Sequence, residues 1–422
     1  MVKKKTRETV MLIWLCWVVY ACSYIGKVNY AANINQVMEF YKVDHSSAGL
    51  VSTCFFFAYG IGQILNGLFC KKYNLKWMVF ASLIVSGIVN FVVGISVNFA
   101  LIKYLWLLNG LSMSILWPSL IRLLSESLPK KDMPQATMVM GTTVATGTFL
   151  VYGLSAVFVK IDFKLAFYLA AVVFAIVAFI WIFSFSGLVK KARENYKEDE
   201  IATTVTQTTG NKDAYNKSLL LLNIVLLGIF GVATNLIKDG LTTWVPSILK
   251  EEYHLDSSFS IILTLLLPVV SIFANAFAVG VHKKIPDYVQ QCAVMFLCAG
   301  IVIGGVIGGV SLNQFWLTLI GFAIACFLAS SCNSVITSIF PLFMKGKVNS
   351  GFVAGILNGC CYLGSTIASY GLGAVADSFG WITVFWILLI VCVFIVIATI
   401  IYSAIKKLLE GRSTKLSGNI DK

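Results

Sequence analysis

Three charged side chains fall deep inside long apolar stretches of the sequence: Lys27, Lys238 and Asp239. A lysine at the centre of a bilayer costs roughly 2.5–3.5 kcal/mol, so it normally faces a cavity or a partner and is a functional candidate by default. The two lysines lie in the first and the seventh apolar stretch, which are equivalent positions in the two halves of the chain. An anion bound between them would contact both halves. We therefore predict that Lys27 and Lys238 bind an anionic substrate.

The residues alone leave an alternative open for each of these charges. Each lysine could pair with protein groups instead of a ligand. Asp239 is adjacent to Lys238, but neighbours on a helix point about 100° apart. Asp239 could therefore form an ion pair with a cation on another helix, or it could couple transport to a proton or to the substrate.

Aromatic and polar side chains lie near the same level as the two lysines. Tyr20 and Tyr24 precede Lys27 by seven and three residues, so the three share one helix face. On a face that carries a buried lysine, we interpret these tyrosines as the lining of a wet cavity. Further substrate-binding candidates are Asn29, Gln63, Trp117 and Asn235.

The elements that must position these residues are membrane helices. Of the 422 residues, 58% are hydrophobic and 12% are charged, and the mean hydropathy is +0.86. A soluble fold needs roughly 25% charged residues to cover its surface, so the exterior of this chain must face lipid. A membrane-spanning helix needs about 20 mainly apolar residues. Twelve stretches qualify: 10–36, 47–70, 77–97, 99–124, 134–159, 163–189, 218–249, 258–281, 288–311, 313–343, 350–375 and 381–405.

Lysine and arginine residues are concentrated in every second loop between the apolar stretches. With the N-terminus in the cytoplasm, 25 of the 32 Lys and Arg residues fall in cytoplasmic segments and five in outside segments. This bias matches the positive-inside rule. It also explains the formal net charge of +13 without a nucleic-acid partner, because basic loops face anionic lipid headgroups. We expect a multi-pass protein of the plasma (inner) membrane with both termini in the cytoplasm.

The longest polar segment, 190–217, has no apolar periodicity and divides the stretches into two sets of six, as a linker does. Tyr152-Gly-Leu-Ser-Ala-Val157 in the fifth stretch resembles Tyr370-Gly-Leu-Gly-Ala-Val375 in the eleventh. Two such halves, related by an axis along the membrane normal, are typical of the all-α, twelve-helix major facilitator fold. The expected organisation is an N-terminal six-helix half (1–189), a cytoplasmic linker (190–217), a C-terminal six-helix half (218–405) and a cytoplasmic tail (406–422).

No enzyme activity, cofactor or metal site is expected. Most of the 11 cysteines lie in apolar stretches, where a thiol behaves as a small hydrophobe, and no spacing resembles a zinc site. The histidines lie in loops or at the ends of the apolar stretches, and no nucleophile–base arrangement is apparent. The three are His45, His254 and His282.

Five segments resemble the organophosphate:phosphate antiporter branch of the major facilitator superfamily, which includes the glycerol-3-phosphate and hexose-6-phosphate carriers. The resemblance covers nearly the whole chain, and its first and last segments are the most specific. The segments are Tyr24–Ala31 (YIGKVNYA), Tyr59–Gly67 (YGIGQILNG), Trp117–Arg122 (WPSLIR), Gly240–Leu249 (GLTTWVPSIL) and Tyr362–Trp381 (YLGSTIASYGLGAVADSFGW).

The resemblance implies a site and a reaction. In that family a basic residue in each of the first and seventh spans binds phosphate, and those positions fall on Lys27 and Lys238. The implied reaction is exchange of an organophosphate for inorganic phosphate, which needs no metal or covalent chemistry. The family's tyrosines around the site fall on Tyr20, Tyr24, Tyr59 and Tyr362.

The chain departs from the family pattern at the cationic positions, where the family has arginine and this sequence has lysine. Arginine offers phosphate a planar bidentate fork, whereas lysine is a strongly hydrated point charge. A carboxylate such as a sugar acid is therefore also compatible with the site. Three other family positions also differ: a second-span lysine falls on Gln63, a fifth-span histidine on Thr143, and an acidic loop residue on Lys71.

We predict a secondary active transporter of a small organic anion, a sugar phosphate or another phosphate ester, that works by alternating access. The alternatives are a transporter-like membrane sensor of an anionic metabolite and a proton-coupled carboxylate (hexuronate-type) symporter. A cation or drug exporter would need intramembrane carboxylates in the N-terminal half, and the sequence has none there. Expected partners are the anion, inorganic phosphate or a proton as counter- or co-substrate, and the lipid bilayer, with the chain acting as a monomer.

Overall fold

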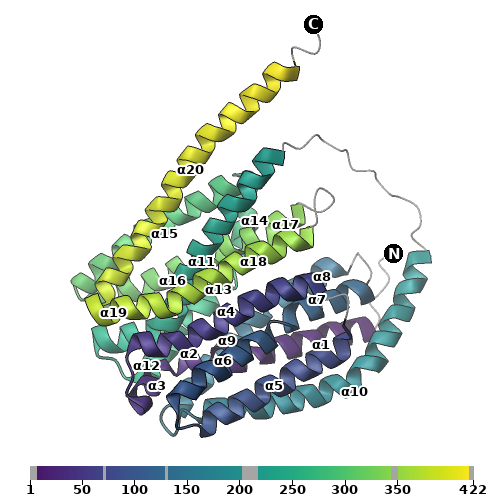
Figure 1. The fold of residues 1–422 in the computed structure, drawn as a ribbon, viewed down its shortest axis with the longest axis vertical. Helices are drawn as coiled ribbons and strands as arrows, with labels where there is room; N and C mark the ends of the chain where they lie inside the picture. Colours follow the sequence, from purple (N-terminus) through teal and green to yellow (C-terminus); the bar gives the residue numbers. More distant parts are fainter. Residues whose placement is uncertain (1–6, 70–72, 129–131, 202–216, 344–349, 418–422) are drawn as a thin grey trace.

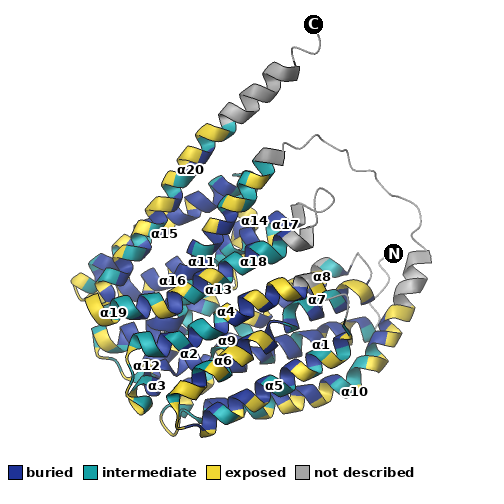
Figure 2. Cartoon of the chain, viewed as in Figure 1, coloured by how far each residue is buried: buried dark blue, intermediate teal, exposed yellow. Residues whose placement is uncertain are grey.

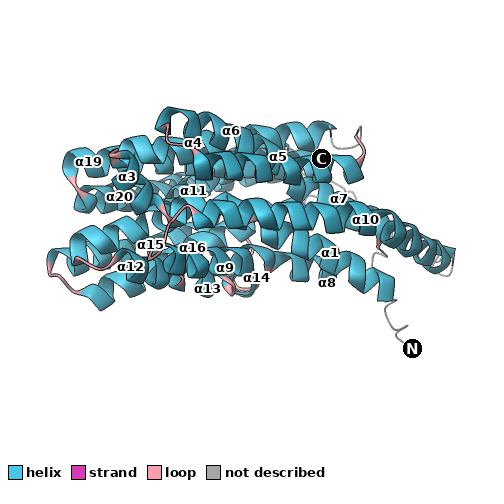
Figure 3. Ribbon diagram, turned by 90° about the horizontal axis from the view of Figure 1, so that it is seen from below, coloured by secondary structure: helices cyan, strands magenta, loops and turns pink. Residues whose placement is uncertain are grey.

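The structure is helical throughout the part of the chain that it describes. In this computed structural model no strand occurs among the described residues, and Figure 3 shows helices joined by short loops. The predicted all-α fold class is confirmed. The described residues are 7–69, 73–128, 132–201, 217–343 and 350–417.

Eleven helical runs in these ranges are long and apolar enough to cross a membrane. The remaining predicted crossing, 350–375, is helical from Ser350 to Phe379. Glycines, hydroxyl side chains and Asn358 make it less apolar than the others. With this run, the described helices account for all twelve predicted crossings.

The first six crossings form the N-terminal half, and three of them contain a break in the helix. The helices are α1 (Arg7–Ser23), α2 (Ile25–Ala32), α3 (Ile34–Tyr41), α4 (His45–Phe69), α5 (Leu75–Ile95), α6 (Phe99–Met113), α7 (Leu116–Ser127), α8 (Met133–Gly141), α9 (Thr143–Phe158) and α10 (Leu165–Ile201).

The last six crossings form the C-terminal half, and two of them contain a π-helical turn, at Val335–Ile339 and at Ala368–Leu372. The helices are α11 (Lys217–Tyr253), α12 (Ser257–Thr264), α13 (Leu266–Ser271), α14 (Ala274–His282), α15 (Tyr288–Ser311), α16 (Phe315–Ser334), α17 (Phe340–Phe343), α18 (Ser350–Ile367), α19 (Gly373–Phe379) and α20 (Trp381–Ser417).

Equivalent helices pack in the same way in both halves. In the N-terminal half α5 packs against α10, and α1 packs against α9; in the C-terminal half α15 packs against α20, and α11 packs against α18. Between the halves, α4 packs against α18 and α9 packs against α12. These are the second crossing with the eleventh and the fifth with the eighth, which a twofold axis exchanges. The predicted pseudo-twofold arrangement is confirmed.

Short polar side chains begin several of these helices at the loops. Asn74, Asn98, Asp256 and Asp287 accept hydrogen bonds from backbone N–H groups at the starts of α5, α6, α12 and α15. An N-cap oxygen satisfies a donor that the first helical turn leaves without a partner. These residues therefore fix where each apolar stretch enters its helix.

Large apolar side chains cover the outside of the bundle. Trp77, Phe183, Ile301 and Ile390 are exposed on α5, α10, α15 and α20. Figure 2 shows exposed residues along the outer helices and buried residues between them. Soluble monomers rarely expose apolar surface on this scale, so the structure agrees with an exterior that faces lipid.

The bundle has two ends. At one of them, here named the linker end, α1 begins, α10 ends, α11 begins and α20 ends (Figure 1). At the opposite end, the far end, α3 is followed by α4 and α11 by α12.

Helices extend beyond two of the predicted boundaries. The predicted linker begins at residue 190, but α10 continues to Ile201, because the helix-forming residues that follow contain no glycine or proline. The predicted tail begins at residue 406, but α20 continues to Ser417. Linker residues 202–216, tail residues 418–422 and Lys71 lie outside the described residues.

Polar contacts join the two halves along α4 and the crossing that contains α18 and α19. They begin at the far end and continue past the middle of α4 toward the linker end. From the far end inward, the pairs are His45 with Asp377, Thr53 with the carbonyl group of Thr366 at 2.8 Å, and Gln63 with Asn358 at 3.4 Å.

Candidate functional site

Lys27 lies just after the break in the first crossing. α1 ends at Ser23 and α2 begins at Ile25, with Tyr24 between them. Gly147 on α9 packs against this break, since a Cβ atom at that position would lie 2.6 Å from the Cβ of Tyr24. The absence of a side chain at Gly147 thus lets α9 hold the start of α2 in place.

Three tyrosine rings surround the ammonium group of Lys27. The Nζ atom lies 4.2 Å from the ring centroid of Tyr59, 5.0 Å from that of Tyr24 and 5.2 Å from that of Tyr362. It also donates a hydrogen bond of 3.4 Å to the hydroxyl group of Tyr362. Each such ring attracts a cation by about 0.5–2 kcal/mol, which offsets part of the cost of a lysine inside the membrane. We call these three residues the tyrosine cage; Tyr24 and Tyr59 come from the N-terminal half and Tyr362 from the C-terminal half.

Lys238 forms an ion pair with Asp239, with Nζ 3.3 Å from Oδ1. Helix geometry predicts that adjacent side chains diverge, but the flexible four-carbon stem of lysine lets its ammonium group fold back onto its neighbour. The side chains are 26% and 17% exposed, respectively. Of the two roles left open for Asp239, an ion pair is therefore present, although its partner is on the same helix and not on another.

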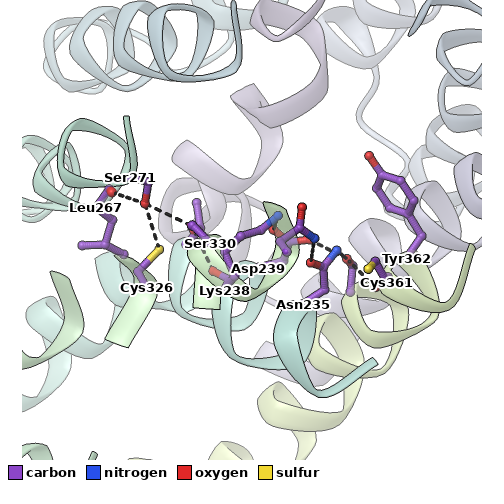
Figure 4. A network of polar contacts seen from close by, with 12 residues as sticks. Asn235, Lys238, Asp239, Leu267, Ser271, Cys326, Ser330, Cys361 and Tyr362 are labelled. Carbon is purple, nitrogen blue, oxygen red and sulfur yellow. Dashed lines mark hydrogen bonds and ion pairs between the residues drawn. The ribbon is translucent and has the colours of Figure 1, made fainter. Parts of the chain in front are cut away.

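A chain of hydrogen bonds holds Asp239 within the C-terminal half (Figure 4). Ser365 on α18 donates its hydroxyl proton to the Asp239 carboxylate and accepts a hydrogen bond of 3.0 Å from the Asn235 amide. Asn333 on α16 donates to the Asn235 carbonyl oxygen at 2.9 Å. The carboxylate beside Lys238 is thus positioned by α11, α16 and α18 together.

The two lysines lie in one electrostatic region. Tyr362, which binds Lys27, lies one helical turn before Ser365, which donates to Asp239 beside Lys238. Two ammonium groups and one carboxylate give these three side chains a net formal charge of +1. Like charges repel at short range, and a bound anion between them removes that repulsion. The arrangement can therefore hold an anion in contact with both halves.

Tyr20 and Trp117 support the tyrosine cage from the N-terminal half. Their ring centroids lie 4.7 Å apart, and the Tyr20 ring meets the Tyr24 ring edge-on at 5.6 Å. Tyr59 and Tyr362, from opposite halves, lie 4.6 Å apart. The structure therefore brings all four predicted tyrosines and Trp117 together around Lys27.

Two other predicted site residues, Gln63 and Asn29, and Thr143, which replaces a family histidine, lie in contacts of their own. Gln63 donates to the carbonyl oxygen of Ser114 at 3.2 Å and accepts from Asn358, so it belongs to the contacts between the halves. Asn29 is fully buried and donates to Asn90 on α5 at 2.8 Å, which turns its amide away from Lys27. Thr143 donates to a backbone carbonyl group of its own crossing.

The sequence prediction did not single out Ser365, Asn333 and Asn358. Ser365 lies within the Tyr362–Trp381 segment, three residues after a predicted site tyrosine, so a helix-spacing argument could have found it. Asn333 and Asn358 carry no comparable signal, because single polar residues occur in many of the crossings.

The described helices form twelve crossings in two pseudo-symmetric halves, which is the architecture of a membrane transporter. A model of the Major Facilitator Superfamily matches residues 16–368. The chain belongs to the major facilitator superfamily.

Several known proteins are similar over most of the chain. Sugar phosphate exchanger 3 of Bos taurus is 22% identical over 421 residues, which cover 87% of this chain and 82% of that protein. A probable hexose phosphate transport protein of Chlamydia pneumoniae is 21% identical over 415 residues, covering 93% and 90%. The membrane sensor protein UhpC of Escherichia coli (strain K12) is 27% identical over 104 residues, covering only 25% and 23%. These relatives match the organophosphate:phosphate antiporter branch, so the predicted resemblance is confirmed.

A solved structure shows the same fold. The inward-facing and occupied structure of a bacterial homologue of the human lysosomal transporter Spinster superposes with a TM-score of 0.71. It is 13% identical in sequence and covers 95% of this chain and 98% of its own. At this identity the likeness concerns the fold alone.

Proposed function

We propose that this protein carries a sugar phosphate or a similar organic anion across the membrane in exchange for inorganic phosphate. The observation that supports this most directly is that α18 links Lys27 and Lys238, one lysine from each half: Tyr362 binds Lys27, and Ser365 binds Asp239 beside Lys238. The names of the relatives that align over most of the chain, a sugar phosphate exchanger and a hexose phosphate transport protein, point to the same substrate class.

The chemistry of a phosphate ester suits the groups present. A phosphate group carries charge close to −2 near neutral pH and has three acceptor oxygens, so it can bind both ammonium groups at once. Tyrosine hydroxyl groups beside Lys27 and the amide and hydroxyl groups beside Asp239 can bind the hydroxyl groups of a sugar. Because the anion contacts both halves, its binding would favour the conformations in which they approach one another.

In the proposed cycle the two halves, 1–189 and 218–405, rotate against each other. The excess of Lys and Arg at the linker end supports a cytoplasmic location for that end and for both termini. The far end, where polar contacts join the halves, would then face the outside.

Counterflow in proteoliposomes tests the substrate class. Vesicles that hold the purified protein are loaded with inorganic phosphate, and uptake of labelled glucose 6-phosphate, glycerol 3-phosphate and glucuronate is compared. We expect uptake of a phosphate ester that depends on internal phosphate. Uptake of glucuronate alone, without need for internal phosphate, would contradict the exchange of phosphate esters and favour the sugar-acid alternative.

The ion pair of Lys238 with Asp239 supports one competing function, proton-coupled symport, because ionisable residues inside membranes often form proton relays. The variant Asp239→Asn keeps the shape of the side chain and raises the formal charge of the region from +1 to +2. For an exchanger we expect counterflow to persist and the affinity for a phosphate dianion to rise several-fold. The readouts are the half-saturation concentration in counterflow and uphill uptake driven by a pH gradient. If the variant loses only the uphill uptake, Asp239 carries the coupling proton and the protein is a symporter.

A sensor would keep the same binding site without transport. The local similarity to UhpC supports this alternative over a quarter of the chain only. The counterflow assay separates the two functions, because a sensor would bind the anion without catalysing exchange.

A further inference from the structure

A second group of charged residues joins the halves at the far end, outside the candidate anion site. Its centre is the imidazole ring of His45, the first residue of α4. Its Nδ1 atom lies 2.6 Å from Oδ1 of Asp377 on α19, and its Nε2 atom lies 2.7 Å from Oε1 of Glu251 near the end of α11. One histidine of the N-terminal half thus contacts two carboxylates of the C-terminal half.

These distances favour one protonation state of the His45 ring. A neutral imidazole has one N–H donor and one lone pair, whereas an imidazolium has two donors. A neutral ring would therefore turn a lone pair toward one of the two carboxylates. With both carboxyl groups ionised, the two contacts are attractive together only when the ring is protonated, so the arrangement favours an imidazolium between two anions.

Further donors hold each carboxylate in position. Asp377 accepts hydrogen bonds from the backbone N–H groups of His45 at 3.1 Å and Ser46 at 2.7 Å, so it caps the first turn of α4 from the opposite half. Glu251 accepts a hydrogen bond of 2.8 Å from the indole of Trp381. Gly380, with φ of 77°, allows the tight turn that brings Asp377 and Trp381 to the same place.

Two tryptophan rings shield the contact. The ring centroids of Trp244 and Trp381 lie 5.6 Å and 5.4 Å from that of His45. The side chains of His45 and Asp377 are 19% and 21% exposed. Partial exclusion of water strengthens the attraction between opposite charges, so the contact with Asp377 is stronger than a fully exposed ion pair, whereas Glu251 is 39% exposed.

The surrounding charges leave this pattern intact. On α11, Lys250 forms an ion pair with Glu39 of α3, which is a second charged link between the halves. Further charged residues at this end are Asp44, which accepts from the Ser47 N–H at 2.8 Å, and Glu252 and His254, which follow Glu251 in the sequence.

We propose that His45, Asp377 and Glu251 form a proton-dependent latch that closes the far end of the bundle. The proposal rests on the alternating access proposed above, in which the far end must open during each cycle. In the closed state the ring binds its proton more tightly than in the open state, where the two carboxylates have moved away. Stabilisation of the closed state is therefore present while the ring is protonated and is lost as the pH rises through the titration of His45. Closing takes up a proton from the far side, and opening returns it there.

The test measures the opening of the far end directly, without substrate. Spin labels are attached to genetically encoded keto amino acids at Val97 and Leu312, which are highly exposed and lie at the far end in opposite halves. Double electron–electron resonance then measures the distance between the two labels at a series of pH values. If the pKa of His45 is one unit higher in the closed state than in the open state, the ratio of closed to open populations is about tenfold smaller at high pH than at low pH. We expect the short distance to dominate at neutral pH and the long one to grow toward pH 9.

Two variants and a control separate the latch from a general effect of pH. His45→Gln, which cannot bind two carboxylates as a cation, should show the long distance at every pH. His45→Arg stays charged and should remain closed across the range, whereas His254→Gln, another far-end histidine, should respond as the wild type does. A wild-type distribution that ignores pH, or a His45→Gln variant with the wild-type response, overturns the latch. Because no transport is measured, a protein that fails to carry phosphate esters would still give a clear answer here.

Discussion

Replacement of Lys27 by alanine is expected to abolish exchange of the anion while leaving expression and folding intact. Truncation of one partner of a buried charge pair costs about 2–5 kcal/mol, which corresponds to roughly thirtyfold to several thousandfold in affinity. Lys238→Ala should have an effect of the same order, because the anion is proposed to need both cations. Initial rates of counterflow at increasing substrate concentration measure the loss.

The matched control for these variants is Lys103→Ala. Lys103 is a lysine on α6 whose ammonium group lies 5.7 Å from the ring of Tyr104, away from the tyrosine cage. This variant should exchange the anion at the wild-type rate. Undiminished exchange by Lys27→Ala or Lys238→Ala, at equal amounts of protein in the vesicles, would falsify the two-lysine site.

The variant Gly49→Val should also stop transport, through the conformation of the protein and not through the anion site. A Cβ atom at Gly49 of α4 would overlap the backbone carbonyl group of Ser369 in the opposite half and lie 3.0 Å from the ring of Trp244. Backbone cannot shift as a flexible side chain can, so the closed far end is destabilised by about 1–3 kcal/mol or more. The distance between labels at Val97 and Leu312 should be long, and exchange should fall at least tenfold.

Gly153→Val on α9 controls for the added side chain, because a Cβ atom there meets nothing within 4 Å. It should leave both the label distance and the exchange rate close to wild type. Normal exchange and a short label distance in Gly49→Val would mean that the halves do not close against Gly49 as described. Thermal unfolding of both variants separates a shifted conformation from a misfolded protein.

The sequence predicts the crossings and the two central cations because both follow from what the bilayer requires of apolar and charged side chains. Apolar stretches of sufficient length must cross the bilayer, and a lysine within one must be stabilised there. The tyrosines around Lys27 follow from helix spacing and from the resemblance to the antiporter branch. These inferences need no knowledge of which rotamers the side chains adopt.

The contacts between particular side chains could not be predicted in the same way. The ion pair of Lys238 with Asp239 depends on a rotamer that overrides the direction of the Cα–Cβ bonds. Asn29 is next to the site in sequence, but its amide binds Asn90 of another helix. His45 was assigned no role, because its two carboxylate partners are more than 200 residues away along the chain.

One crossing carries parts of both the anion site and the far-end latch. Tyr362 and Ser365 lie on α18, Asp377 lies on α19, and the π-helical turn Ala368–Leu372 separates them. A π-helical turn interrupts the regular hydrogen-bond ladder of a helix and often marks a functional position. Binding of the substrate at Tyr362 and Ser365 and release of the proton beside Asp377 would therefore be coupled through the five residues of this turn. Substitutions within the turn could uncouple the two events without changing any residue that binds the substrate or the proton.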